Sequence, residues 1–356
     1  MGDCKYCGKS AGFLRGKHRE CDEVYKTGWL EMVERARQAA VDAEFQKAEL
    51  HAELITIAER SWANCFDVDN AIAKGWRDAV FACLVDEMIA EDDETRLRSF
   101  SAYFALEDDP QNYEVLATLK VAVRNRYISV AALAALAGDG AEYDALEMTL
   151  RGSGLPPGEQ RKVLIAGWEA AVRKTLDDRV PSLVEQATLL EYLSRFNLSH
   201  SEVNDNHASL RLVQAGVMRD LPKGDLPQVF TREQFLPINL QKSEEPVWLF
   251  YDVSYYEMRT RKERRRGEHY DSVIIEEEEL HEEHRVDEGV LGITNKNIYF
   301  NGRYEKFRIP YEKIMSFDQY RDGFGLMRDA RAAKPQIFRT GDGWFVYNLV
   351  VNLARL

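Results

Sequence analysis

The sequence lacks any apolar run close to the roughly 20 residues that cross a bilayer, and its start, MGDCKYCGKS, lacks the apolar core of a signal peptide. It has five cysteines, an odd number, which argues against a disulfide framework. It has no excess of positive charge, since a net charge of −13 disfavours a protein whose whole surface follows a phosphate backbone. These absences predict a cytoplasmic protein and leave peripheral association with a membrane as an alternative.

Catalytic motifs are also missing. The sequence has no P-loop, nucleophile elbow, HExxH pair or glycine-rich dinucleotide fingerprint. The glycine-rich segment Gly152-Ser-Gly154-Leu-Pro-Pro-Gly158 is a poor phosphate cradle because its two prolines have no amide hydrogen. We therefore expect a protein that is not an enzyme, with a metal-dependent hydrolase as the weakest of the hypotheses.

What is present is a chain of 356 residues, 45% hydrophobic and 30% charged. At roughly 150 residues per domain, it is long enough for two or three domains with cores of their own. The fold class that we expect is multidomain α+β. We predict a small zinc finger over residues 1–24, an all-α duplicated middle over 25–220, a linker over 221–245, and an antiparallel β barrel or sheet capped by a terminal helix over 246–356.

Four metal-ligand residues lie near the start of the chain. Cys4 and Cys7 are separated by two residues and followed by Gly8, which fits a tight knuckle in which glycine takes a positive φ. His18 and Cys21 are three residues apart and would share one face of a helical turn. Three thiolates and one imidazole complete a tetrahedral set, so we predict a structural Zn²⁺ at these four residues. The segment resembles the short zinc-finger heads of bacterial multidomain proteins.

The finger is rich in basic side chains, which are Lys5, Lys9, Arg15, Lys17 and Arg19. Such a surface would suit nucleic acid or an acidic protein partner. The other interpretation is a solvated surface, because nearby carboxylates dilute the charge, namely Asp3, Glu20, Asp22 and Glu23.

The middle of the chain has a helical pattern that repeats. Residues 29–62 are strong helix formers with apolar residues at helical spacing, so one long helix is expected there. Beyond it, Gly75-Trp76 recurs as Gly167-Trp168, an interval of 167 − 75 = 92. The same interval pairs Leu97 with Leu189, Phe100 with Tyr192, Phe104 with Phe196, Leu106 with Leu198 and Asn112 with Asn204. We predict two copies of one helical unit, over about 50–115 and 142–210.

Each copy has an acidic turn between two helices, with Asp86 in the first and Asp178 in the second. Carboxylates there fit helix N-termini, where they accept bonds from free amides and meet the positive end of the dipole. A divalent-cation site at Asp86 and Asp178 is the alternative. This order of helix, acidic turn and helix resembles the TerB-like family of tellurite-resistance proteins. The resemblance includes the Phe-x-Leu that follows in each copy, Phe104-Ala-Leu106 and Phe196-Asn-Leu198. This resemblance implies a role in bacterial stress or anti-phage response.

After four prolines between residues 221 and 246, the composition shifts to alternating Val, Ile, Tyr and Phe, which predicts strands. Asn301-Gly302 between two apolar runs predicts a tight hairpin turn in which both residues take a positive φ. Thr340-Gly-Asp342-Gly predicts a helix cap. A helix to the chain end is predicted from the apolar spacing of Val346, Leu349, Val350 and Leu353.

A curved antiparallel sheet with one terminal helix resembles the bacterial pleckstrin-homology and GRAM-like domains. The residues that carry the likeness are Gly289-Val-Leu-Gly-Ile-Thr-Asn-Lys-Asn-Ile-Tyr-Phe, Phe307-Arg-Ile-Pro-Tyr, and Lys334-Pro-Gln-Ile-Phe through Thr340-Gly-Asp-Gly-Trp-Phe. The resemblance implies a binding scaffold without catalytic residues.

A basic stretch near the first strands is a candidate anion site, formed by Arg259, Arg261, Lys262, Arg264, Arg265 and Arg266. The competing interpretation is charge pairing within the sheet, because Glu276 to Glu279, Glu282 and Glu283 follow closely.

Taken together, the modules predict a non-catalytic adaptor or sensor with a protein partner. The alternative is a peripheral binder of anionic phosphates, either nucleic acid through the finger or lipid headgroups of a membrane through the basic stretch.

Overall fold

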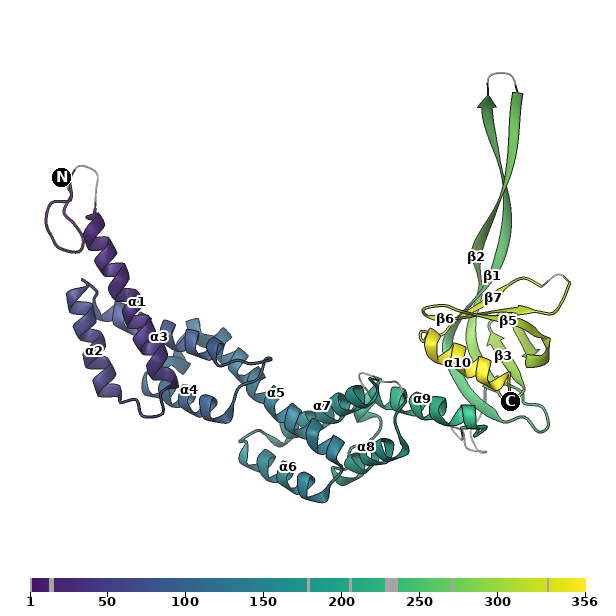
Figure 1. The fold of residues 1–356 in the computed structure, drawn as a ribbon, viewed down its shortest axis with the longest axis horizontal. Coiled ribbons are helices and arrows are strands. Elements are labelled where there is room, and N and C mark those ends of the chain that lie inside the picture. Colours follow the sequence, from purple (N-terminus) through teal and green to yellow (C-terminus); the bar gives the residue numbers. More distant parts are fainter. Residues whose placement is uncertain are drawn as a thin grey trace. The chain divides into compact units, whose positions relative to one another are not determined.

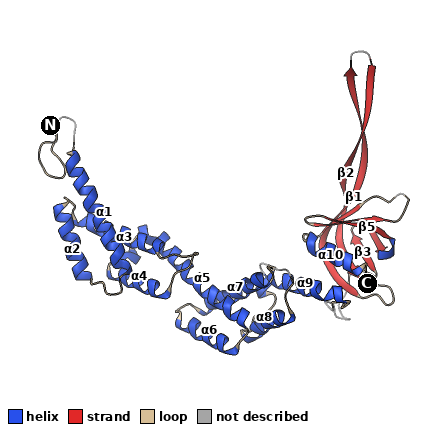
Figure 2. Cartoon of the chain, in the orientation of Figure 1, coloured by secondary structure: helices blue, strands red, loops and turns tan. Residues whose placement is uncertain are grey.

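The computed structural model describes residues 2–12, 16–177, 180–204, 207–227, 236–269, 272–331 and 333–356, with the backbone alone for residues 204 and 261–281. The described part has ten α-helices and seven strands (Figures 1 and 2). It divides into two compact units, the first formed by Met1–Ala171 with Tyr192–Leu198 and the second by Val172–Glu191 with Ser199–Leu356. The α+β class is confirmed, and the boundary between the units falls inside the helical middle.

The helices are α1 (Arg19–Val41), α2 (Lys47–Arg60), α3 (Cys65–Ala82), α4 (Glu91–Tyr103), α5 (Tyr113–Ala137), α6 (Gly140–Gly152), α7 (Pro157–Thr175), α8 (Leu183–Arg195), α9 (Ala208–Asp220) and α10 (Gly343–Leu353). The strands are β1 (Pro246–His269), β2 (Ser272–Thr294), β3 (Asn297–Gly302), β4 (Lys306–Pro310), β5 (Ile314–Gln319), β6 (Gly323–Arg328) and β7 (Gln336–Arg339). None of the described helices is long and apolar enough to span a bilayer.

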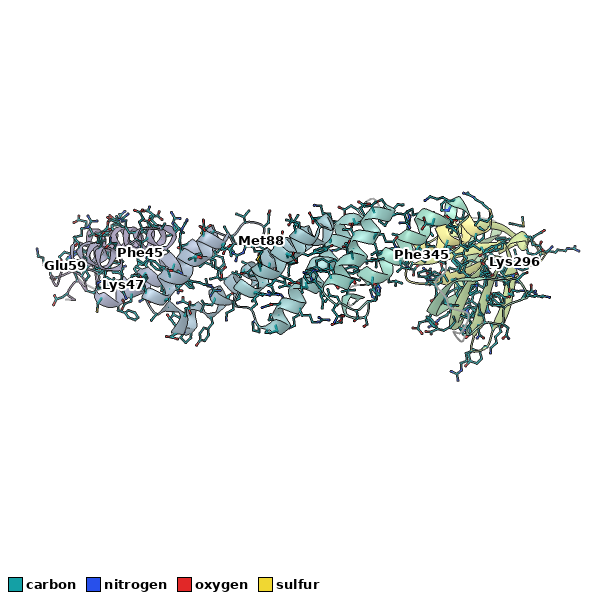
Figure 3. All side chains as sticks on the ribbon, turned by 90° about the horizontal axis from the view of Figure 1, so that it is seen from below. Phe45, Lys47, Glu59, Met88, Lys296 and Phe345 are labelled. Carbon is teal, nitrogen blue, oxygen red and sulfur yellow. The ribbon has the colours of Figure 1, made fainter. Side chains whose placement is uncertain are left out.

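The single helix predicted over residues 29–62 is wrong, because α1 ends at Val41 and α2 begins at Lys47. In the turn between them, the Asp42 carboxylate accepts a hydrogen bond from the Glu44 amide at 2.9 Å. Phe45, labelled in Figure 3, packs on the ring of Phe100 with centroids 5.2 Å apart. Phe45 is half-buried, and the packing of its ring on a distant helix outweighs the helix propensity of the turn, which is a weak preference.

Helix boundaries in the middle of the chain recur at the interval found in the sequence. Helix α3 begins at Cys65 and α7 at Pro157, and α4 begins at Glu91 and α8 at Leu183, so both intervals are 92 residues (157 − 65 and 183 − 91). The backbone repeats the same detail after each pair, since Ala105 and Asn197 both have a left-handed conformation, with φ of 52° and 49°. The same apolar positions are also buried in both copies, including Trp76 with Trp168 and Leu97 with Leu189.

A glycine sets the closest helix approach in each copy. An added Cβ at Gly75 would lie 2.6 Å from Ala36 Cβ, and one at Gly167 would lie 2.4 Å from Ala131 Cβ. Helix α5, which carries Ala131, therefore takes the place in the second copy that α1, which carries Ala36, takes in the first. Because α5 also follows α4, the two copies share one helix, and the structural repeat begins earlier in each copy than the sequence pattern indicated.

The second unit contains one antiparallel sheet with the strand order β4-β3-β2-β1-β7-β6-β5. Its first two strands form a long hairpin, of which β7 pairs with residues 254–257 and β3 with residues 289–293. Helix α10 packs against the sheet and buries the four residues predicted from its spacing, Val346, Leu349, Val350 and Leu353. Its predicted cap is confirmed, because the Asp342 carboxylate accepts a hydrogen bond from the Phe345 amide at 3.0 Å.

The predicted hairpin exists between β3 and β4, but Asn301 and Gly302 do not form its turn. Both belong to β3, and the turn closes with the Gly302 amide donating to the Glu305 carbonyl at 2.9 Å. A side chain at Gly302 would meet the Asp287 carboxylate at 2.3 Å. Glycine is needed here for the close approach of a side chain from the neighbouring strand, and not for a positive φ.

The described ends of the predicted linker, residues 221–245, are packed. Leu221 is fully buried and belongs to the same hydrophobic core as the sheet, together with Val217 and Met218 of α9. Glu244 is also buried and receives hydrogen bonds from Thr294, Asn297 and Tyr299. The segment therefore joins α9 to the sheet within one core over its described residues.

Candidate metal centre

The first pair of predicted ligands lies on a tight loop held by the backbone. The Cys4 amide donates to the Lys9 carbonyl at 2.7 Å, and the Gly8 amide donates to the Cys4 carbonyl at 2.9 Å. Gly8 has a φ of +70°, as predicted from its place after Cys7. The loop thereby turns both sulfurs inward, and Cys4 is buried.

The second pair lies at the start of α1. His18 is the residue before the first helical turn, and Cys21 is in that turn, with the Asp22 amide donating to the His18 carbonyl at 3.1 Å. The helical spacing therefore brings the His18 ring and the Cys21 sulfur to one side, as predicted.

The four ligand atoms converge on one point. They all lie within 4.8 Å of one another, and Nδ1 of His18 is 3.4 Å from Sγ of Cys7 and 3.7 Å from Sγ of Cys21. Tetrahedral bonds of about 2.3 Å to sulfur and about 2.1 Å to nitrogen place neighbouring ligand atoms about 3.6 Å apart. The other ring nitrogen, Nε2 of His18, lies 3.0 Å from the Ser10 carbonyl, which orients Nδ1 toward the sulfurs. The donor set therefore fits a metal ion.

The electrostatics of the cluster favour one thiolate before any cation binds. Burial opposes ionisation of Cys4, but backbone amides of Cys7, His18 and Tyr6 lower its pKa to about 6. Burial together with hydrogen bonds to Cys7 and Cys4 raises the pKa of Cys21 to about 11. The Ser10 carbonyl raises the pKa of His18. A cation that binds here would release protons, chiefly from Cys21.

The finger is fixed to the first helical unit by aromatic and charged side chains. Tyr6 stacks on Tyr25 with ring centroids 5.0 Å apart and donates to the Asp22 carboxylate at 3.0 Å. Tyr25 donates in turn to the Asp67 carboxylate of α3 at 2.8 Å. The metal-ligand loop is thus connected through α1 to α3.

Comparisons of the chain with protein-family models, curated proteins and solved structures give no match. The function is therefore inferred from the chemistry of the described residues.

The charge of the finger is partly neutralised within the chain. Lys17 forms an ion pair with Asp22 at 2.6 Å, and Arg19 pairs with Glu23 at 2.9 Å. Arg15 lies outside the described residues. These pairs agree with the interpretation of the finger as a solvated surface.

The acidic turns do not assemble a metal site in the described chain. Asp86 is exposed at the tip of a two-residue turn between Val85 and Met88, whose amides and carbonyls bond to each other at 2.9 Å. Asp178 lies outside the described residues. Among described side chains, the cluster at Cys4, Cys7, His18 and Cys21 is the one grouping of ligands suited to an ion. The carboxylates that follow, Glu91 to Glu94, occupy the first turn of α4, as the helix-start interpretation requires.

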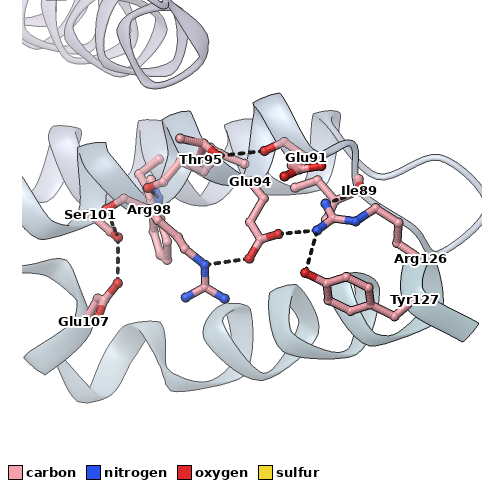
Figure 4. Close-up of polar contacts among 11 residues, drawn as sticks. Ile89, Glu91, Glu94, Thr95, Arg98, Ser101, Glu107, Arg126 and Tyr127 are labelled. Atoms are coloured by element: carbon pink, nitrogen blue, oxygen red, sulfur yellow. Dashed lines mark hydrogen bonds and ion pairs between the residues drawn. The ribbon is translucent and has the colours of Figure 1, made fainter. Parts of the chain in front are cut away.

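An arginine that the sequence analysis missed closes the first helical copy (Figure 4). Arg126 of α5 donates to the Ile89 carbonyl at 3.1 Å and to the Glu94 carboxylate at 2.8 Å, and Glu94 also accepts from Arg98 at 2.8 Å. The guanidinium of Arg126 lies over the Tyr127 ring at 5.0 Å. This arginine therefore ties α5 to the start of α4.

The second copy has the same arginine contact. Arg219 of α9 donates to the Pro181 carbonyl at 3.3 Å and to the Gln186 side chain at 2.8 Å. Gln186 occupies the position equivalent to Glu94, since 186 − 94 = 92. The two arginines themselves are 93 residues apart (219 − 126), one more than the interval, which would pair Arg126 with Met218. The fixed interval therefore does not reveal this contact, and the structure does.

The basic stretch of the sheet lies on the outer part of the β1–β2 hairpin. Arg259 is exposed, and Arg261, Lys262, Arg264, Arg265 and Arg266 lie where only the backbone is described. The strand register places Arg259 opposite Glu282, Lys262 opposite Glu279 and Arg264 opposite Glu277. A basic strand thus runs beside an acidic strand, as the charge-pairing interpretation expects.

Proposed function

We propose that the chain is a non-catalytic modular binding protein, an adaptor or sensor, whose N-terminal module depends on a structural Zn²⁺. The observation that carries this proposal is the closed four-ligand cluster of Cys4, Cys7, His18 and Cys21. A catalytic zinc keeps one position for water or substrate, whereas four protein ligands satisfy the ion. Three thiolates with one imidazole favour Zn²⁺ over the harder cations Mg²⁺ and Ca²⁺.

The partner that best suits the first unit is a protein segment. Beside the finger is a cleft of about 400 Å³ whose lining includes Tyr25, Trp29, Lys74 and Arg77. Tyrosine, tryptophan and arginine are the residues most enriched at the centres of protein interfaces. Because Tyr25 also stacks on Tyr6 of the finger, metal binding would keep this cleft in shape.

The resemblance of the middle to TerB-like proteins, and of the sheet to pleckstrin-homology and GRAM-like domains, supports a place in bacterial stress or anti-phage response. The resemblance of the sheet implies a binding scaffold, and a modular adaptor in the cytoplasm would combine it with the helical middle.

The first test measures metal content. Elemental analysis of the purified chain should give one zinc per molecule, and the Cys4→Ser variant should lose it. A wild-type chain without zinc, or with another metal at the same stoichiometry, would contradict the metal assignment.

The second test measures partner binding. The tagged chain, cross-linked in the cells that produce it, should retain a protein that is reduced at least about tenfold with either Cys4→Ser or Trp29→Ala. Leu30→Ala is the matched control, because Leu30 is the next residue on α1 and is 66% exposed. A set of captured proteins that is identical for all four chains would contradict the adaptor proposal.

A further inference from the structure

A second cavity lies within the second unit, apart from the metal centre. It has a volume of about 800 Å³ and is bordered by the end of α7, by α9 and by the start of α10. Apolar walls come from Val172, Ala215 and Phe345, and Phe345 also packs on Trp248 with ring centroids 4.8 Å apart. Phe345 on α10 is labelled in Figure 3. A volume of this size is typical of sites for small organic ligands.

A buried amide faces the cavity. Gln214 of α9 lines it and is only 8% exposed. Its carboxamide has no hydrogen-bond partner among the residues that the structure describes, in contrast to Gln186, which accepts a bond from Arg219 at 2.8 Å. The nitrogen and oxygen of this carboxamide are not among the fully buried unpaired side-chain atoms of the described chain, so they are open to the cavity, where a ligand can reach them. A ligand in the cavity would supply both the donor and the acceptor that this amide needs.

Two arginines border the same cavity from different helices, Arg173 on α7 and Arg211 on α9. Within the described ranges, neither guanidinium forms a hydrogen bond or an ion pair. Of the two carboxylates at the cavity, that of Asp342 already accepts the Phe345 amide as the cap of α10. The other, Asp177, is exposed and also lines the cavity. Paired guanidinium groups suit the oxygens of a phosphate.

We propose that this cavity binds a nucleotide. Arg173 and Arg211 would hold the phosphate, the apolar walls would cover the ring, and the amide of Gln214 would bind the edge of the base with one donor and one acceptor. Asp177 would accept a hydrogen bond from a ribose hydroxyl. The inference goes beyond the proposed adaptor function, because no residue of the cavity belongs to the unit that holds the metal centre.

The test uses calorimetric titration of the full chain with the four ribonucleoside 5′-monophosphates and with inorganic phosphate. At least one nucleotide should bind saturably with a Kd below about 1 mM, and inorganic phosphate should bind at least about tenfold more weakly. The double variant R173A/R211A and the variant Gln214→Leu should each weaken nucleotide binding at least about tenfold. Arg355→Ala, an exposed arginine beyond α10, is the matched control and should bind as the wild type does.

Melting temperature separates binding effects from misfolding. Both arginines are exposed, so R173A/R211A should melt within about 2 °C of the wild type. The charge-preserving variant R173K/R211K should recover part of the affinity lost by the alanine variant. The proposal is overturned if no monophosphate binds below about 1 mM, or if R173A/R211A binds the nucleotide as tightly as the wild type.

Discussion

At the scale of single residues, Gly75 and Gly167 decide how closely the helices of each copy approach. At Gly75 an added Cβ would lie 2.6 Å from both the Ala36 side chain and the Val33 carbonyl. These contacts are shorter than van der Waals separation, and one of them is with backbone. The same glycine therefore holds the same helix contact in both copies.

Replacement of either glycine by alanine should separate the helices. We expect Gly75→Ala and Gly167→Ala each to lower the free energy of unfolding by about 1–3 kcal/mol, because the added methyl overpacks the contact. The measurement is urea unfolding followed by helical circular dichroism. Gly152→Ala is the control, since its added Cβ meets nothing within 4 Å, and it should be neutral or stabilising. Equal effects at all three glycines would contradict the packing argument.

A second residue-scale feature is the buried carboxylate of Glu244. It accepts hydrogen bonds from the Gln241 amide at 2.5 Å and the Thr294 hydroxyl at 3.1 Å, and also from Tyr299 and Asn297. Burial opposes its ionisation, but these hydrogen bonds outweigh burial and lower the pKa of Glu244 below its usual value of 4.5. The folded state therefore favours the charged form of Glu244.

A lowered pKa in the folded state makes the contribution of Glu244 depend on pH. It is fully present above the unfolded value of about 4.5 and is lost as the pH falls through the folded pKa. We expect Glu244→Gln to cost about 1–3 kcal/mol at pH 7. In denaturant titrations at a series of pH values, the difference from the wild type should shrink below pH 4.5. A difference that stays constant down to the acid limit would contradict this assignment.

At the scale of elements, the outer part of the β1–β2 hairpin stands apart from the core of the second unit. The core includes Tyr255 on β1 and Leu291 on β2, with Val286 packed against it, and none of its described members lies between Tyr255 and Val286. The register continues through Arg259 and Glu282 to the end of the hairpin. Nearer the sheet, Arg339 of β7 donates to the Glu283 carboxylate at 2.7 Å, and the Met258 amide donates to the Pro335 carbonyl at 3.0 Å. From Arg259 and Glu282 outward, the described contacts are those between the backbones of β1 and β2.

Excision of this outer hairpin should leave the domain stable. We expect a chain in which residues 260–281 are replaced by Asn-Gly to melt within about 2 °C of the wild type, because no described core contact is removed. Differential scanning calorimetry measures the shift. A much larger fall in melting temperature would show that the outer hairpin packs on the rest of the unit.

At the scale of the whole molecule, the chain consists of two compact units, and the candidate metal-binding cluster belongs to the first alone. The core of the second unit is built from residues between Val217 and Leu353. Loss of metal should therefore act on one unit and leave the packing of the other intact.

Hydrogen exchange after chelation of the metal tests this independence. Amides of residues 2–12 and the first turns of α1 should exchange faster, because the ion replaces the core that so short a segment cannot build. Strands β3, β6 and β7 should keep their protection. Faster exchange throughout the second unit would contradict the division into independent units.

The sequence by itself was sufficient for features fixed over short distances along the chain. The Cys/His cluster suited to a metal ion, the glycine after Cys7, the Asp342 cap and the apolar face of α10 each depend on spacings of a few residues, and the structure has all of them. Alternating residues predicted the strands, since side chains of a strand point to opposite faces in turn. The hairpin expected at Asn301-Gly302 predicted antiparallel pairing, which β3 and β4 have although the turn itself lies beyond these two residues.

Only the tertiary structure decided the features that join distant segments. Phe45 packing on Phe100 ends α1 early, the Asp287 carboxylate explains the glycine at position 302, and Arg126 and Arg219 tie each last helix to a turn far back along the chain. The cavity lined by Gln214 is likewise bordered by three helices, α7, α9 and α10. Local propensities differ by less than about 1 kcal/mol per residue, whereas burial of one aromatic side chain is worth about 2–3 kcal/mol. Where local propensity and long-range packing disagree, the packing therefore determines the structure.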